Sequence, residues 1–388
     1  MNKLFNNTKV AFSLKKDSEL ERAYFLFKMI ANEPLVRIGT GMTNFAIKAH
    51  LPVEGLIRAT VFDHFCGGVS EDDCIPVIDK MYGEKVCSVL DYSVEGKVDE
   101  AQFDAAFDMT VKLLDFVKEK EAIPFAVFKP TGFGRIELYE KVGNKLELSN
   151  EEVEEWNRVV ARYDKVCSLA KEKDVKLLID AEESWMQEAA DDLVTDMMRK
   201  YNTEKAIVFN TLQMYRWDRL DYLKELHAEA KAKGFFVGMK LVRGAYMEKE
   251  NERAIANDYT SPICESKEAT DRNFDNGVAY MLENSGVLSL FAGTHNEDSS
   301  YLVMQLMQEY NIPTNSDSVW FGQLYGMSDH ISYNLSKAGY NVAKYLPFGP
   351  VKDVMPYLIR RAEENTSVAG QTTRELNLLK EERKRRKV

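Results

Sequence analysis

The chain has 388 residues, of which 45% are hydrophobic and 29% are charged, and its formal net charge is −11. This composition is typical of a globular protein, and the negative charge disfavours a nucleic-acid-binding surface spread over the whole body. Five dispersed cysteines without a C-x-x-C pair predict reduced thiols, with neither a disulfide framework nor a zinc site. The N-terminus lacks the pattern of a secretory or transit peptide, and no apolar run reaches the ~18 residues of a membrane span. We therefore expect a cytoplasmic protein.

Residues 17–50 have the pattern of amphipathic helices. Asp17 and Ser18 can cap the first helix, and Leu20, Tyr24 and Phe27 recur at helical spacing. We expect residues 1–84 to form a helical arm or cap ahead of the main domain.

From about residue 86, short apolar runs alternate with long, charged, amphipathic segments. The expected strands are Val86 to Leu90, Phe125 to Phe128, Val175 to Ile179, Ala206 to Phe209, Phe236 to Val242, Leu288 to Ala292, Val319 to Phe321 and Val342 to Leu346. The expected helices are 99–119, 150–171, 184–199, 216–233, 266–283, 299–310, 323–338 and 351–364. Continuous apolar strands followed by helices indicate a parallel sheet that is covered on its faces. Eight consecutive units predict an α/β fold, a (β/α)8 barrel over residues 85–366, with an open doubly wound sheet as the alternative.

Polar residues follow most of the expected strands. Because the carboxyl ends of barrel strands carry the chemistry of this fold, these residues are candidates for a site. They are Lys129, Asp180, Gln213, Lys240, Arg243, Gly244, Tyr246, His295, Asn296 and Tyr345, together with Tyr357, Arg360, Arg361 and Glu364 on the last expected helix.

Each of these residues also has an ordinary structural explanation. Asp180 can cap a helix, His295 can be a hydrogen-bonded loop residue, and the pair Arg360 and Arg361 can be a solvated helix face. Their convergence at one end of the barrel indicates a charged pocket for a polar ligand. Two arginines and a lysine would hold a carboxylate. Neither a metal-ligand set nor a nucleophilic triad is evident, so we expect a cofactor to supply the chemistry.

Six blocks of the sequence, in order, resemble those of the proline dehydrogenase family. They are Phe128-Lys129-Pro130-Thr131, Asp180-Ala181-Glu182-Glu183, Lys240 to Tyr246, Ala292 to Asn296, Gln323 to Met327, and Tyr345 to Gly349 continuing through Tyr357-Leu358-Ile359-Arg360-Arg361. The resemblance covers roughly residues 85 to 366. Lys240 and Met247 differ from many bacterial members, so the chain looks more like the monofunctional, eukaryotic-type branch.

The resemblance implies a distorted barrel that binds FAD and oxidises L-proline to Δ1-pyrroline-5-carboxylate in proline catabolism, with electrons passed to a membrane quinone. It also implies a separate pyrroline-5-carboxylate dehydrogenase, because the chain is too short for the bifunctional members. Carried over by position, Lys129, Arg360 and Arg361 would bind the proline carboxylate. Catalytic and substrate-binding positions would further include Asp180, Tyr345, Tyr357, Leu324, Ala245 and Tyr246. Flavin contacts would come from Asp180, Gln213, Lys240, Arg243, Gly244, Lys267, His295, Asn296 and Glu364.

The bulk of Tyr345 favours proline over hydroxyproline, because relatives that oxidise hydroxyproline have a small residue there. A hydroxyproline dehydrogenase remains an alternative. So do a cofactor-free lyase or aldolase that uses Lys129 or Lys240 as a Schiff base, and a non-catalytic amino-acid-binding protein.

The last residues, 380–388, hold six basic and two acidic side chains. They form part of a basic C-terminal tail, residues 367–388. A solvated, unstructured terminus is one interpretation. The other is docking on an anionic lipid surface at the inner face of a membrane, with Leu376 and Leu379 at the boundary.

Overall fold

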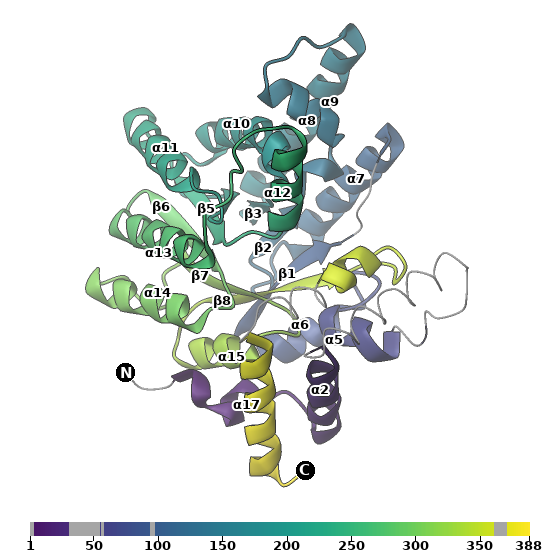
Figure 1. The fold of residues 1–388 in the computed structure, drawn as a ribbon, viewed down its shortest axis with the longest axis vertical. Helices are drawn as coiled ribbons and strands as arrows, with labels where there is room; N and C mark the ends of the chain where they lie inside the picture. Colours follow the sequence, from purple (N-terminus) through teal and green to yellow (C-terminus); the bar gives the residue numbers. More distant parts are fainter. Residues whose placement is uncertain (1–3, 31–54, 56–57, 94–97, 361–370) are drawn as a thin grey trace. The chain divides into compact units, whose positions relative to one another are not determined.

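The computed structural model describes residues 4–30, 55, 58–93, 98–360 and 371–388. Its strands form a closed barrel in the order β1-β2-β3-β4-β5-β6-β7-β8 (Figure 1). The paired strands run parallel, with β1 joined to β8 and each strand from β2 to β6 joined to the next. The predicted parallel (β/α)8 barrel is therefore confirmed, and the open sheet was the wrong alternative.

All eight expected strands are present, to within a few residues at their ends. They are β1 (Val86–Tyr92), β2 (Phe125–Phe128), β3 (Lys176–Ile179), β4 (Val208–Gln213), β5 (Val237–Val242), β6 (Leu288–Gly293), β7 (Val319–Leu324) and β8 (Val342–Phe348).

By its contacts the chain divides into two compact units, one made of residues 1–95 and 323–388, and the other of residues 96–322. The boundaries expected at residues 84 and 366 stay a prediction. The helices of the second unit are α7 (Glu100–Val117), η3 (Pro130–Gly132), α8 (Ile136–Gly143), α9 (Asn150–Glu172), α10 (Ser184–Tyr201), α11 (Arg219–Lys233), α12 (Met247–Ala256), α13 (Lys267–Glu283) and α14 (Glu297–Glu309). Those of the first are η1 (Leu4–Asn6), α1 (Thr8–Ala11), α2 (Asp17–Ile30), η2 (Arg58–Phe62), α5 (Asp63–Phe65), α6 (Ile75–Tyr82), α15 (Asp329–Lys337) and α17 (Gln371–Arg386).

Aromatic side chains from different strands of the second unit pack against one another. Phe125 contacts Phe209, Phe291 and Trp320 edge to face, with ring centroids 5.1–5.8 Å apart. Glycine on a neighbouring strand makes room for such a ring, because a Cβ at Gly322 would lie 2.1 Å from Phe291. The rings close this layer of the barrel, so polar chemistry is left to the strand ends.

The helix expected over residues 323–338 begins later than predicted. β7 continues to Leu324, a turn follows, and α15 starts only at Asp329. Gly326 (φ +79°) and Ser328 (φ +50°) adopt left-handed conformations that interrupt any helix. A Cβ at Gly326 would lie 2.3 Å from the carbonyl oxygen of His64, so glycine is required at this turn.

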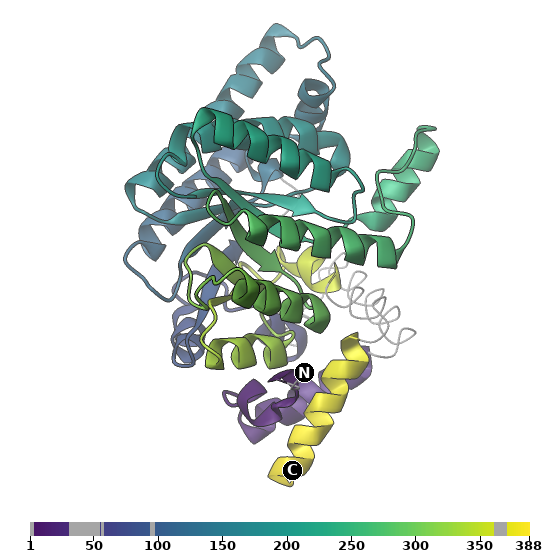
Figure 2. The same cartoon turned by 90° about the vertical axis from the view of Figure 1, so that its left-hand side faces the viewer.

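The basic C-terminal segment is a helix, α17, and the interpretation as an unstructured terminus was wrong. It runs beside the N-terminal helices, as both views show (Figures 1 and 2). Leu378 and Leu379 are buried with Leu20 and Phe27 of α2, so Leu379 does not lie at a lipid boundary. Arg383 pairs with Glu21 across the two helices.

Candidate functional site

In the second unit, the carboxyl ends of β3 and β5 are joined by an ion pair. The ammonium group of Lys240 on β5 pairs with the carboxylate of Asp180, the residue after β3. The side chain of Lys240 is only 7% exposed and that of Asp180 is 16% exposed. Charged side chains are rarely buried unless they are paired, so this ion pair shows that the carboxyl end of the barrel accommodates buried charged groups.

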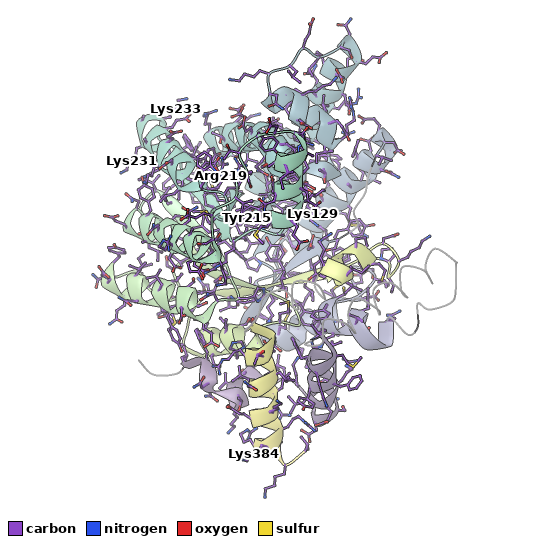
Figure 3. The ribbon with its side chains drawn as sticks, in the orientation of Figure 1. Lys129, Tyr215, Arg219, Lys231, Lys233 and Lys384 are labelled. Carbon is purple, nitrogen blue, oxygen red and sulfur yellow. The ribbon has the colours of Figure 1, made fainter. Side chains whose placement is uncertain are left out.

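Lys129 follows β2 and is partly buried, and the short helix η3 begins directly after it (Figure 3). Thr131, two residues after Lys129, is hydrogen-bonded to Glu182 in the loop after β3. Its backbone N–H donates to Glu182 Oε2 at 2.8 Å and its hydroxyl donates to Glu182 Oε1 at 2.7 Å. The turn that carries Lys129 is therefore fixed by a carboxylate.

The loop after β5 is shaped by a close approach of Tyr215. Gly244 has φ +129°, and a Cβ there would lie 2.6 Å from the ring of Tyr215. Tyr215 is labelled in Figure 3. The backbone N–H of Ala245 donates to Gln213 Oε1 at 3.4 Å. Gly244 and Ala245 are exposed, and Tyr246 is partly exposed. The loop is thus held against the end of β4 while its backbone stays accessible.

Arg243 connects three elements around the end of β6. Its guanidinium donates to Asp271 of α13 at 2.6 Å, to the Thr294 hydroxyl at 3.0 Å and to the Ser299 hydroxyl at 3.0 Å. Lys267 pairs with the same Asp271, at 2.7 Å. The structure therefore brings Arg243 and Lys267 together through one shared carboxylate, and this carboxylate offsets their charge.

His295 and Asn296 follow β6 and are partly buried. Asn296 is the N-cap of α14, because its side-chain oxygen accepts from the backbone N–H of Ser299 at 3.0 Å. The side chain of Asn296 thus has a structural role at the helix start.

In the first unit, the predicted site residues lie around the turn after β7 and on β8. Leu324 ends β7 and is partly buried, and Tyr345 on β8 is 8% exposed. The carbonyl of Tyr345 accepts from the backbone N–H of Tyr325 at 2.8 Å. Tyr357 is buried in a core with Phe65 and Met327. Arg360 is partly exposed at the end of the helical residues 355–360, whereas Arg361 and Glu364 lie outside the described residues.

A buried charge cluster holds the turn after β7. Asp329 at the start of α15 pairs with Lys15 at 2.9 Å and with Lys344 of β8 at 2.8 Å. Lys344 also donates to the carbonyl of Met327 at 2.7 Å. Burial by itself would raise the pKa of Asp329, but the two lysines outweigh it and hold this pKa well below its usual range. The cluster fixes the backbone next to Leu324.

Sequence reasoning assigned no role to Glu182, Tyr215, Asp271 or Asp329. Glu182 lies in the Asp180-Ala181-Glu182-Glu183 run, where residue type gives no sign of which carboxylate turns inward. Asp271 and Asp329 lie within amphipathic segments, where an acidic residue is ordinarily solvated.

Comparison with known proteins identifies the family of the chain. The family model for "Proline dehydrogenase" matches residues 74–374. "Carbapenem antibiotics biosynthesis protein CarD" of Pectobacterium carotovorum is 34% identical over 369 residues, which cover 93% of this chain and 94% of that protein. "Proline dehydrogenase 1, mitochondrial" of Homo sapiens is 39% identical over 235 residues, which cover 60% of this chain and 39% of that protein.

A solved structure of proline utilization A from Bdellovibrio bacteriovorus superposes with a TM-score of 0.73 at 21% identity, covering 95% of this chain and 40% of that one. The chain thus spans under half the length of that protein and of the human relative, and nearly all of CarD. The family's enzymes oxidise proline in proline catabolism. Since the family model spans well over half of its residues, the chain belongs to the proline dehydrogenase family of oxidoreductases.

Proposed function

We propose that this chain catalyses the FAD-dependent oxidation of L-proline to Δ1-pyrroline-5-carboxylate. The observation that carries the proposal is the buried pair of Lys240 and Asp180 at the carboxyl ends of β5 and β3, within the region that the family model matches. Such a pair supplies fixed charge at the place where this fold performs chemistry.

In this proposal Lys129, Arg360 and Arg361 bind the substrate carboxylate, since lysine and arginine provide charge-assisted donors for it. Asp180, Tyr345, Tyr357, Leu324, Ala245 and Tyr246 shape the pocket and hold the proline ring in one orientation. A fixed ring lowers the entropic part of the barrier to hydride loss. The proton of the substrate amine must also leave, and we assign no residue to that step.

The residues present fit a flavin. The exposed backbone of Gly244 and Ala245 would let a planar ring approach it closely, because Gly244 carries no side chain, and the ammonium group of Lys240 supplies positive charge. Gln213, His295, Asn296, Lys267, Arg243, Asp180 and Glu364 are the other proposed contacts. When bound, the flavin would supply the two-electron acceptor for the hydride. Arg243 would act partly through its bonds to Asp271, Thr294 and Ser299, which hold α13 and α14 in place.

We propose that a membrane quinone takes the electrons and that a separate pyrroline-5-carboxylate dehydrogenase takes the product. No helix among the described residues is long and apolar enough to cross a bilayer. For contact with the membrane we propose the exposed lysines of α17 as the candidate region.

The end-to-end similarity to CarD favours a second physiological setting for the same chemistry. That relative is named for antibiotic biosynthesis, and its match with this chain covers 94% of its length. In that setting the oxidised product would feed a biosynthetic enzyme. A deletion strain distinguishes the two, since only the catabolic role predicts loss of growth on proline as the sole nitrogen source.

The first test is the visible spectrum of the purified protein, recorded without oxygen before and after addition of L-proline. Flavin bands near ~450 nm that bleach with proline, and much more slowly with hydroxyproline, are the expected result. A colourless protein that stays inert after FAD is supplied would contradict the proposal. Trapping of a carbonyl substrate on Lys129 or Lys240 by borohydride would instead support the lyase alternative.

A further inference from the structure

Glu182 joins the loop after β3 to the turn after β2. Both of its carboxylate oxygens accept hydrogen bonds from Thr131, one from the backbone and one from the hydroxyl. Thr131 lies in η3, two residues after Lys129. The carboxylate therefore restrains the turn from which the Lys129 side chain extends.

Glu182 is itself fixed by neighbours on both sides. Its backbone N–H donates to Gln187 Oε1 at 2.9 Å, and its carbonyl accepts from Gln213 Nε2 at 2.6 Å. Gln187 in turn donates to Asp191 at 2.7 Å, and Asp191 pairs with Arg219 at 2.8 Å. This chain of bonds runs through α10, β4 and α11, so the carboxylate has a rigid support.

The negative charge of Glu182 is costly where it lies. The residue is 6% exposed, and burial raises the pKa of its carboxyl to about 7, although the Thr131 bonds and Lys129 oppose the rise. The other titratable groups that face it are Glu183 beside it, Tyr139 of α8 and Tyr163 of α9. A neutral glutamine could fill the same space, so packing alone does not explain a carboxylate at this position.

We propose that Glu182 is a positioning residue, which fixes the Lys129–Gly132 turn so that the Lys129 ammonium meets the substrate carboxylate. The inference rests on the proposed function, in which Lys129 binds the proline carboxylate. Glu182 acts through the turn and through its charge beside Lys129.

The test compares Glu182→Gln with Glu183→Gln, a matched control at the adjacent buried carboxylate, which pairs with Lys249 instead of Thr131. In Glu182→Gln the amide oxygen can accept from the Thr131 N–H and the amide NH2 can donate to the Thr131 hydroxyl oxygen, so both hydrogen bonds lose their charge assistance. We expect the KM for L-proline to rise about tenfold, with kcat changed less than about threefold. The control should change KM by less than about twofold. The effect of the double variant Glu182→Gln/Thr131→Val on KM should be smaller than the sum of the two single effects, because both changes weaken the same contact.

Two further readouts separate positioning from a general loss of structure. In the unsubstituted protein the KM should rise as pH falls through about 7, since protonation of Glu182 removes its charge. This pH dependence of the KM should be absent in Glu182→Gln. Amide hydrogen exchange should increase over residues 129–134 and stay unchanged in β4 and β5.

An unchanged KM in Glu182→Gln would overturn the inference and leave the proposed function intact. Equal losses in kcat and kcat/KM, accompanied by a lower melting temperature, would also overturn it, because they indicate a structural role only. An unsubstituted protein that does not oxidise proline, even with FAD supplied, would overturn the proposed function and this inference together.

Discussion

Lys240 of β5 and Asp180 of the loop after β3 form an ion pair with both side chains largely buried. β3 and β5 lie on either side of β4 in the barrel, and the ion pair thus links their carboxyl ends. Burying a charge costs free energy, and the attraction between the two opposite charges offsets part of that cost.

The substitution Asp180→Asn should therefore lower both the stability of the fold and the activity. Removing the carboxylate leaves a buried ammonium without that partner, and we expect a loss of about 3 kcal/mol in the free energy of unfolding. Activity with L-proline should fall at least about tenfold. Urea denaturation and steady-state kinetics measure the two effects. The control is Asp174→Asn, which breaks an exposed pair with Lys205 and should cost less than about 1 kcal/mol.

Tyr345→Ser should change the choice of substrate. The side chain of Tyr345 on β8 is bulky and largely buried, and its removal would open space for a 4-hydroxyl group. We expect the ratio of kcat/KM for hydroxyproline to that for proline to rise about tenfold. Tyr340→Ser, just before the same strand, should leave the ratio unchanged. If both variants behave alike, Tyr345 has no part in substrate choice.

Asp329→Asn should weaken the first unit and alter its response to acid. The pKa of Asp329 is lower in the folded than in the unfolded protein, so its pairs with Lys15 and Lys344 stabilise the fold at neutral pH. That contribution is lost as pH falls from about 4 towards the folded-state pKa. We expect the variant to lose about 3 kcal/mol at pH 7 and to show a shallower fall in melting temperature below pH 4. A melting curve at pH 7 like that of Asp353→Asn, an exposed acidic residue of the same unit, would contradict this.

Lipid docking through α17 can be separated from its structural role. Arg383 and Arg386 form ion pairs with Glu21 and Asp17, whereas Lys380, Lys384 and Lys387 are exposed. Figure 3 labels Lys384 in the last turns of the helix. Replacing the three lysines by serine should reduce binding to anionic vesicles by about 100-fold, at ~1 kcal/mol for each charge, with the melting temperature unchanged.

The matched control replaces three lysines of α11, namely Lys224, Lys231 and Lys233, by serine. Both variants lose the same charge, and Lys231 and Lys233 are also labelled in Figure 3. Equal vesicle binding by the α11 variant, the α17 variant and the unsubstituted protein would remove the helix from any account of membrane contact.

Much of the barrel could be predicted from the sequence because its strands are continuous apolar runs and its long helices are amphipathic. The charge-rich helices α12 and α17 could not. In α12 the exposed residues outnumber the buried ones, which are Glu250 and Ala254, so no apolar stripe marks the helix. In α17 the basic residues mask two buried leucines, whose partners lie at the other end of the sequence. The position of Glu182 depends on the backbone of a distant turn, which local pattern does not encode.

Arg383 and Glu21 are 362 residues apart in sequence, and the helices that carry them contribute to the same apolar cluster. During synthesis at about 5–20 residues per second, α2 is complete long before α17 exists. Leu378 and Leu379, which pack against Leu20 and Phe27, are thus synthesised tens of seconds after them. The earliest long helix of the chain is among the last to be buried, and until then it offers an apolar surface to chaperones and to other unfinished chains.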